Sequence, residues 1–288
     1  MPLLLLLLWL SQATLVPEGE ILVKGAVPSA SDASTPVPEE GRIGEGRYRN
    51  AYFGLTYPVP AGWIEQPAGP PPSEAGSYVL TQFALLDGER VKAHVLVSAQ
   101  DLFFVPFEAA GSKDVVARMR TMVQEQYAFE KGPDQVTIAG RTFERLAYKG
   151  RRAKLHWRMF TTETRCHALT FTFTGSDTAA LDAAEKALGQ VVLGGDAPAC
   201  VNGYARDHLV QRTTPAFQQR YNTIPVRVII DAEGKVKHAH LLSAFPEQSE
   251  PILKALRDWR FQPYVVAGKA AEVETGLVFG RPPSRVAP

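Results

Sequence analysis

The residues best suited to chemistry are histidines on predicted strands. His156 and His167 fall on the two arms of one predicted hairpin, with Arg158 between them in register. Imidazole and guanidinium groups on one sheet face can hold an anion or a metal ion. One hypothesis is therefore a metal-binding or hydrolytic protein that uses this His/Arg face. The alternative is an ordinary polar sheet face.

A second pair, His238 and His240, is two residues apart on a predicted strand. Side chains two apart on a strand share a face, which is ligand-like spacing. A zinc site also needs a third and usually a fourth ligand, and none is evident nearby. We therefore expect two histidines on a solvent-facing surface.

The common catalytic signatures are missing from the sequence, including H-E-x-x-H, G-x-S-x-G and the Walker-type loop. The glycine cluster Gly41, Gly44 and Gly46 lies in a segment predicted to be flexible and does not follow a strand. We therefore expect a protein that is not an enzyme, with no catalytic residue, no cofactor and no resident metal.

The two cysteines, Cys166 and Cys200, leave two interpretations open. An even pair in an oxidising compartment can form a disulfide. Alternatively, Cys166 is a small apolar residue buried in a strand. Neither thiol lies in a C-x-x-C motif, so we expect no redox activity.

The N-terminus predicts export. Leu3 to Leu8 is an unbroken leucine run, and Ser11-Gln12-Ala13 is a small-residue ending suited to signal peptidase. We expect a signal peptide at 1–13 and a periplasmic or secreted bacterial protein. An inner-membrane anchor is less favoured, because a spanning helix needs about 20 apolar residues. Membrane contact is expected only if this segment is uncleaved. The net charge of +1 offers no footprint for nucleic acid.

Composition and periodicity divide the rest of the chain. Pro, Ser, Ala, Gly and Glu dominate up to residue 46, which predicts a flexible tether at 14–46, with one short strand allowed at Ile21–Val23. A folded unit follows at 47–194. Its predicted elements are strands at 51–59, 78–86 and 90–98, a helix from Ser112 to Gly132-Pro133, strands at 135–138, 142–148, 153–160 and 165–174 with a hairpin turn at 161–164, and a helix capped by Ser176 or Asp177.

This order of elements indicates an antiparallel sheet with helices packed on it. Tyr48-Arg-Asn50, Tyr52-Phe-Gly-Leu55 and Pro60-Ala-Gly-Trp63 resemble the opening of PsbP-like domains. The resemblance implies an α/β/α sandwich that acts in binding and assembly. It implies no catalytic residues.

A linker is predicted at 195–212, a second folded unit at 213–280 and a disordered tail at 281–288. In the second unit, a strand at 225–230 meets the tight turn Asp231–Gly234, and a second strand runs to residue 242. A helix capped by Ser249, the run Trp259-Arg-Phe-Gln-Pro263 and a third strand follow. The whole chain is therefore predicted to be α+β, a sandwich followed by a small three-stranded sheet with one covering helix.

The second unit resembles the TonB C-terminal domain in its Asp-x-x-Gly turn, in Leu241-Leu-Ser243 and in Trp259-Arg-Phe-Gln-Pro263. The resemblance implies a protein partner in the cell envelope, such as an outer-membrane transporter or its periplasmic segment, bound partly by strand addition. An exposed sheet edge supports that use physically. The edge expected to bind consists of Ala271, Glu272, Val273, Glu274, Thr275, Gly276, Leu277, Val278 and Phe279.

True energy transducers of that family carry a full spanning helix and a long Pro-rich spacer. This chain has a folded unit where the spacer would lie. We therefore expect partner recognition and not the transmission of force from the inner membrane.

Overall fold

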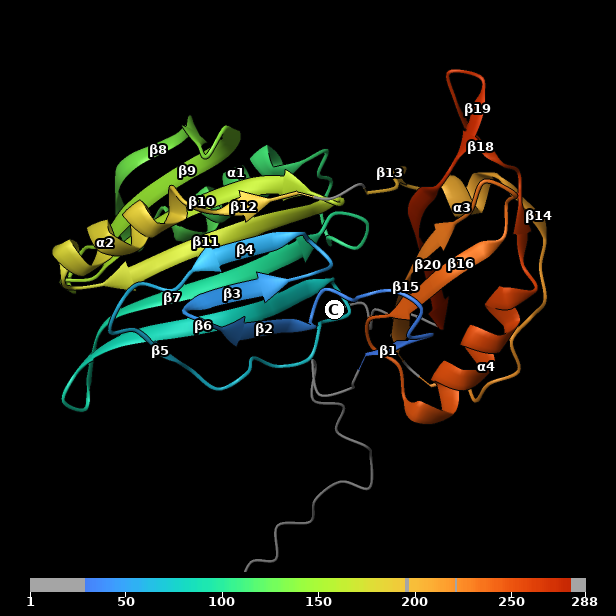
Figure 1. Cartoon of the computed structure of the whole chain (residues 1–288), viewed down its shortest axis with the longest axis horizontal. Helices are drawn as coiled ribbons and strands as arrows, with labels where there is room; N and C mark the ends of the chain where they lie inside the picture. Colours follow the sequence, from blue (N-terminus) through green and yellow to red (C-terminus); the bar gives the residue numbers. More distant parts are fainter. Residues whose placement is uncertain (1–28, 195–196, 221, 281–288) are drawn as a thin grey trace, which may run out of the picture.

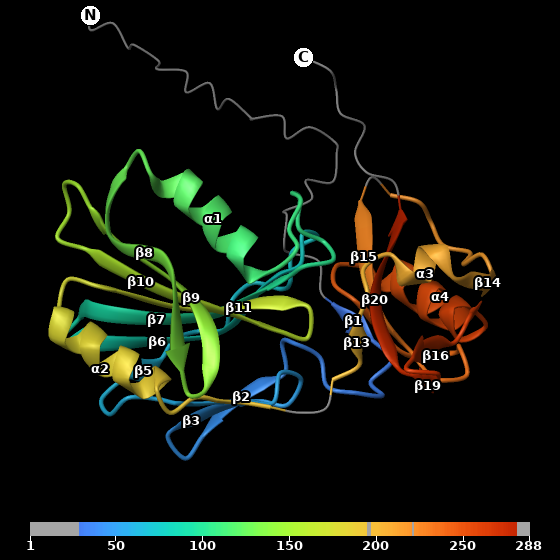
Figure 2. The same cartoon turned by 90° about the horizontal axis from the view of Figure 1, so that it is seen from above.

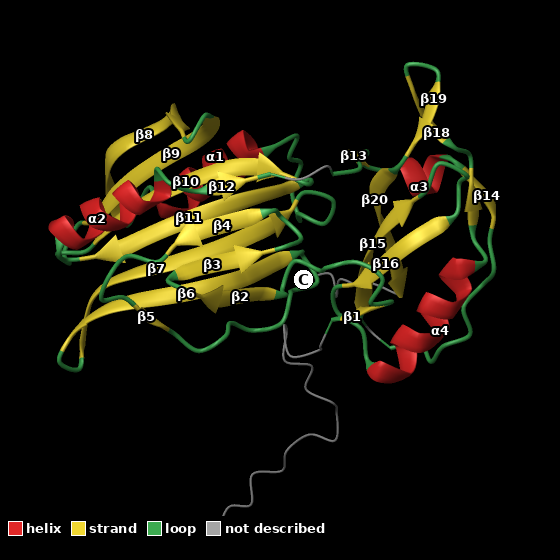
Figure 3. Ribbon diagram, in the orientation of Figure 1, coloured by secondary structure: helices red, strands yellow, loops and turns green. Residues whose placement is uncertain are grey.

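A computed structural model describes residues 29–194, 197–220 and 222–280. The predicted signal peptide, the strand at Ile21–Val23 and the tail at 281–288 lie outside the described residues. Figure 1 shows two units side by side, each built mainly from strands. Figure 3 shows how few helices accompany them, so the chain is α+β. Within the described ranges, no helix is long and apolar enough to cross a membrane.

The central unit is built on a seven-stranded antiparallel sheet with the order β5-β6-β7-β11-β10-β9-β8. Its strands are β5 (Ile64–Glu65), β6 (Ser77–Asp87), β7 (Arg90–Asp101), β8 (Tyr127–Ile138), β9 (Arg141–Gly150), β10 (His156–Thr164) and β11 (His167–Gly175). A smaller sheet, β12-β4-β3-β2, contains β2 (Gly41–Gly44), β3 (Arg47–Asn50), β4 (Leu55–Pro58) and β12 (Val192–Leu193). The helices are α1 (Ser112–Val123) and α2 (Thr178–Leu188).

Alternation along the long strands decides the layers. Val95 and Val97 on β7 and Phe171 and Phe173 on β11 face one side, where the smaller sheet and α2 complete the main core. On the opposite face, Val116 of α1 packs into a smaller apolar cluster. Figure 2 shows α1 on one side of the large sheet and β2 and β3 on the other.

The C-terminal unit is a five-stranded sheet with the order β1-β16-β15-β20-β13. Its strands are β1 (Ala30–Ser31), β13 (Ala199–Cys200), β15 (Thr223–Ile230), β16 (Val236–Leu241) and β20 (Val273–Gly280). The helix α4 (Pro246–Arg257) covers one face, and α3 (Tyr204–Asp207) packs nearby. Two short pairs join β14 (Leu209–Gln211) to β17 (Arg260–Phe261) and β18 (Tyr264–Val266) to β19 (Lys269–Ala271).

Several predicted boundaries in the central unit differ from the structure. The first helix ends at Val123 and not at Gly132-Pro133, because β8 begins at Tyr127 and runs through that dipeptide while paired with β9. The second helix begins after Asp177, whose Oδ1 accepts a hydrogen bond from the Ala180 N–H at 3.1 Å.

The predicted hairpin turn at 161–164 is also wrong. Strand β10 continues through Thr164, and the reversal falls on Arg165 and Cys166, which have φ of +48° and +54°. The strand predicted at 51–59 is shorter in the structure, because residues 51–54 form a turn before β4.

The described part of the predicted tether, residues 29–46, is folded. Strand β1 pairs with β16, and β2 pairs with β3. Main-chain pairing at an open sheet edge holds this segment, so its low content of large apolar residues is not decisive. In Figure 1, β1 lies in the C-terminal unit although it precedes the central one.

The predicted linker at 195–212 is likewise part of the C-terminal unit in its described residues. Strand β13 adds to β20, and Tyr204 and Ala205 are buried in the core with Trp259 and Phe261. The helix α4 begins at Pro246 and not beside Ser249, and the Phe245 N–H donates to Gln248 Oε1 at 3.3 Å.

Candidate functional site

Strand β20, which contains residues 273–279 of the predicted binding edge, lies inside the sheet for part of its length, whereas Ala271 belongs to β19. Its inner side pairs with β15 over the whole strand, from Val273 to Gly280. On its outer side β13 pairs with Val273 and Glu274. The N–H groups of Ala199 and Val201 donate to the carbonyls of Glu272 and Glu274, at 3.2 and 3.1 Å. The predicted edge is therefore already occupied at its first residues.

The outer side is open farther along the strand. Hydrogen-bonding groups repeat every second residue, so Gly276, Val278 and Gly280 present their N–H and C=O groups on the side where Glu272 and Glu274 meet β13. Among the described residues, no strand pairs with them there. A cavity of about 840 Å³ lies beside this stretch, and we call it the β20 groove.

The walls of the β20 groove come from both units. Phe103 and Phe104 of the central unit approach Gly276 so closely that an added Cβ would lie 2.9 Å from the Phe103 Cβ. Opposite them, Phe217 and Trp259 provide apolar surface. Trp259 Nε1 donates a hydrogen bond to the carbonyl of Thr213 at 2.8 Å. This bond holds the segment that precedes β15 against the indole ring. The groove therefore depends on the fixed placement of the two units.

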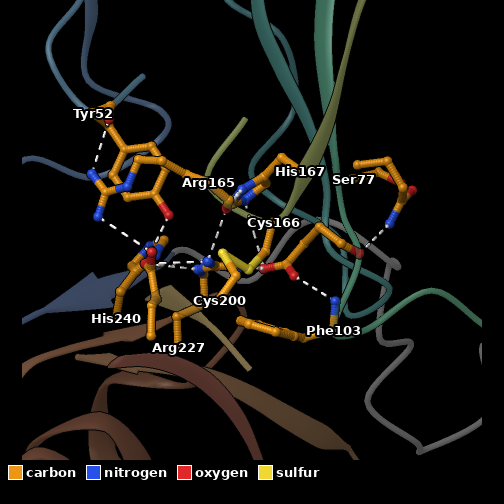
Figure 4. Close-up of polar contacts among 12 residues, drawn as sticks. Tyr52, Ser77, Phe103, Arg165, Cys166, His167, Cys200, Arg227 and His240 are labelled. Atoms are coloured by element: carbon orange, nitrogen blue, oxygen red, sulfur yellow. Dashed lines mark hydrogen bonds and ion pairs between the residues drawn. A yellow bond between two sulfur atoms is a disulfide. The ribbon is translucent and has the colours of Figure 1, made fainter. Parts of the chain in front are cut away.

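A buried ion network provides that placement. Arg227 on β15 is 2% exposed, and its Nη1 lies 2.6 Å from Asp101 Oδ2 at the end of β7. Its Nη2 lies 3.1 Å from Glu274 Oε1 on β20. The same Nη2 donates to the Arg165 carbonyl at 3.2 Å, in the turn between β10 and β11. Figure 4 shows Arg227 of the C-terminal unit close to Arg165 of the central unit.

Tyr52 and Arg165 complete the network. The Tyr52 hydroxyl donates to Glu274 Oε1 at 2.9 Å, and Arg165 Nη1 donates to the Tyr52 carbonyl at 2.9 Å. The Arg165 guanidinium also lies 3.8 Å from the centre of the Tyr52 ring, a cation–π contact. Two carboxylates and two guanidinium groups therefore balance one another at this junction.

The pKa values of Asp101 and Glu274 shift in opposite directions. Burial raises the pKa of Asp101 above its ordinary value, although Arg227 opposes the shift. Burial also acts to raise the pKa of Glu274, but Arg227 and Arg165 outweigh it and leave that pKa lowered. The enclosed carboxylates serve as ion partners of Arg227 and Arg165.

A disulfide joins the units at the same place. Cys166, in the turn between β10 and β11, is bonded to Cys200 on β13. The bond ties the strand that covers the start of β20 to the central unit.

The structure does not bring His156, Arg158 and His167 together. Arg158 pairs across the hairpin with Phe173, and His167 pairs with Thr164 at the far end. His156 contacts Glu130, and Arg158 forms ion pairs with Asp182 and Glu185. The described residues hold no cluster of three or more potential metal ligands.

His238 and His240 are buried, contrary to the predicted solvent-facing surface. Their rings contact residues of the predicted tether: His238 Nδ1 lies 2.6 Å from Asp32 Oδ1, and His240 Nε2 lies 3.0 Å from Glu39 Oε1. The folded segment covers the face that sequence periodicity alone leaves open.

His167 makes stability depend on pH. It is fully buried, and burial, followed by the charge of Arg227, holds its pKa well below 6.5. Below about pH 6.5 the unfolded chain binds a proton that the folded chain does not, so stability falls as pH falls. We expect the urea midpoint to decrease from about pH 7.5 to pH 5.5, with a smaller decrease in His167→Gln.

The control for that measurement is the comparison of the wild-type protein with His167→Gln. Asp101, whose raised pKa acts in the opposite sense, is present in both proteins but lies 3.6 Å from His167 Nε2, so the difference reports His167 together with its effect on Asp101. Equal decreases would contradict the assignment.

Comparison with known proteins adds little. No family model and no curated protein matches the chain. Among solved structures, cyanobacterial PsbP (CyanoP) from Synechocystis aligns with a TM-score of 0.39 and 19% identity, over 54% of this chain and 96% of that one. LpqN of Mycobacterium tuberculosis, involved in cell envelope biogenesis, aligns with a TM-score of 0.36 and 13% identity, over 58% and 92%. At these scores neither likeness carries an argument about function.

Proposed function

We propose that this protein is a non-catalytic binding protein that takes up an extended peptide segment of a protein partner as an added strand along β20. The observation that carries the proposal is the unpaired outer side of Gly276–Gly280 facing the β20 groove. Main-chain groups on a free edge supply the hydrogen bonds, and the flanking walls select side chains.

The walls indicate the kind of peptide. Alternate side chains of an added strand point to opposite faces, toward Phe217 and Trp259 or toward Phe103 and Phe104. Both directions are apolar. Arg206 and Arg212 line the groove, which contains no carboxylate among its lining residues. Arg206 is already paired with Asp207 at 2.7 Å, so Arg212 is the cation that remains for an acidic side chain. The favoured peptide therefore combines apolar residues with an acidic one.

The resemblance of the C-terminal unit to the TonB C-terminal domain suggests the partner's location. It supports a protein of the bacterial cell envelope, such as an outer-membrane transporter with a periplasmic segment. The proposal includes export of the chain by its N-terminal leucine-rich segment, and it includes no cofactor.

The test uses the full oxidised chain and a peptide selected from a phage library of random short peptides, followed by fluorescence polarisation. Val278→Pro removes the outward N–H of residue 278. The residue opposite it on β15 is Pro225, which has no N–H to donate. We expect it to weaken peptide binding about tenfold or more. Val278→Thr keeps the N–H and the branched side chain, so we expect binding within about twofold of wild type.

Urea midpoints of both variants establish that each is folded. If no peptide is enriched, or if Val278→Pro binds as tightly as Val278→Thr, strand addition at β20 is not the mechanism.

A further inference from the structure

The outward faces of β7 and β11 carry no formal charge over a long stretch. Opposite the core-facing residues, β7 presents His94, Leu96, Ser98 and Gln100, and β11 presents Ala168, Thr170, Thr172 and Thr174. A sheet face in contact with water ordinarily carries charged side chains. This chain is 21% Asp, Glu, Lys and Arg, yet none occupies these eight positions.

Strand register sets these residues in rows. Thr174 is opposite His94, Thr172 is opposite Leu96 and Thr170 is opposite Ser98. On the other side of β11, the same rows continue into Trp157, Met159 and Thr161 of β10. The face is therefore apolar at Trp157 and Met159 of β10, and its hydroxyl groups lie mainly on β11, with Ser98 on β7.

A cavity of about 590 Å³ lies over this face, lined also by α1 and by residues 70–79. That volume falls within the range of about 300–1,000 Å³ common for small-molecule sites. No Asp, Glu, Lys or Arg lines it. Burial lowers the pKa of His94, the one lining imidazole, and so favours its neutral form. A charged ligand would lose its hydration without gaining an ion partner.

The two ends of the cavity differ. Beneath α1, Val116 packs with Tyr148 and Met159, and Met119 lies against the same cluster. Toward β7, the half-buried Thr172 and Ser98 offer hydroxyl groups that are not engaged by any other described side chain. An apolar chain suits the first end, and a hydroxylated head group suits the second.

From these observations we propose that the central unit binds one molecule of a neutral amphiphile, with its alkyl chain beneath α1 and its hydroxylated head over the Thr and Ser rows of β11 and β7. The site is separate from the β20 groove and shares no lining residue with it. A protein partner is disfavoured, because α1 and residues 70–79 flank the face and leave a cavity of small-molecule size.

The test is isothermal titration calorimetry of the full chain with octyl glucoside below its critical micelle concentration. We expect saturable binding of one molecule. Octanoate has an alkyl chain of the same length with a charged head group. We expect its affinity to be lower than that of octyl glucoside by about tenfold or more. Glucose lacks the chain and should give no saturable heat, because the apolar contribution is lost.

Variants at Thr172 locate the site. Thr172→Asp places a carboxylate in the cavity and should weaken octyl glucoside binding about tenfold or more. Thr172→Val removes only the hydroxyl and should weaken it by about two- to fivefold. Thr137→Asp is the matched control on the exposed part of β8, outside the cavity, and should leave affinity unchanged.

Circular dichroism of each variant establishes folding. The proposal is overturned if octyl glucoside gives no saturable binding, if octanoate binds as tightly, or if folded Thr172→Asp and Thr137→Asp have equal affinity.

Discussion

Arg227→Met is expected to lower the free energy of unfolding by about 3–5 kcal/mol, the usual cost of breaking a buried ion pair from one side. The guanidinium is 2% exposed and lies between Asp101 and Glu274, which are themselves buried. Methionine fills a similar volume, so the main loss is electrostatic. Two carboxylates then remain in the junction with only Arg165 to offset them. Urea denaturation at neutral pH measures the change.

Arg158→Met is the matched control for that experiment. Arg158 also pairs with two carboxylates, Asp182 and Glu185, but these partners are 68% and 38% exposed. Ion pairs in contact with water contribute about 0–1 kcal/mol, so we expect a small change. Equal losses in the two variants would contradict the special role of the buried network.

A compensated variant distinguishes charge from packing. Combining Arg227→Met with Asp101→Asn and Glu274→Gln removes the unbalanced charges along with the guanidinium. We expect this triple variant to be more stable than Arg227→Met alone, because neutral groups cost less to bury. If it is no more stable, lost packing and not charge explains the effect.

The sequence contains a usable sign of this network. Arg227 stands between Val226 and Val228 in a run of apolar residues from Ile224 to Ile230. A charge inside a strand that is apolar on both faces indicates burial with a partner. Its partners could not be predicted the same way, because Asp101 and Glu274 lie 126 and 47 residues away in the chain. Only the packing of the two units brings them together.

The hypothesis of a His/Arg face failed on register. A turn at 161–164 would set Arg158 directly opposite His167. The observed turn at Arg165 and Cys166 sets Phe173 there instead. Alternation of side chains is visible in the sequence, but turn position decides which residues meet across a hairpin. Here the turn uses two non-glycine residues with positive φ, which composition does not announce.

The long strands other than β8, and α2, were predictable because each carries its own periodic pattern or cap. The first part of β8 was assigned to the preceding helix. The folded parts of the predicted tether and linker were not. Strands β1 and β13 are two residues long, and main-chain hydrogen bonds to another part of the chain hold them. Those bonds leave no side-chain pattern. The same reason explains why the covered first residues of the β20 edge, Val273 and Glu274, escaped prediction.

Loss of the Cys166–Cys200 disulfide is expected to lower the free energy of unfolding by about 4 kcal/mol. The bond spans 34 residues, and the entropy of closing a loop of that length in the unfolded chain gives a value of roughly this size. Urea denaturation of Cys166→Ser/Cys200→Ser, compared with the oxidised chain, measures it. A reducing agent added to the double variant should leave its free energy of unfolding unchanged. This measurement controls for effects of the reductant itself.

The disulfide and the Arg227 network hold the same junction, so their effects should be coupled. Cys166 precedes His167 in the turn whose Arg165 carbonyl accepts from Arg227. When either the disulfide or the Arg227 network is lost, the two units are less firmly held together. The remaining interaction then stabilises the junction to a different extent than it does in the wild type. We expect the disulfide and Arg227→Met to be non-additive by about 0.5–3 kcal/mol in a double-mutant cycle. Strict additivity would mean that the two links stabilise independent parts of the fold, and the β20 groove would not depend on them jointly.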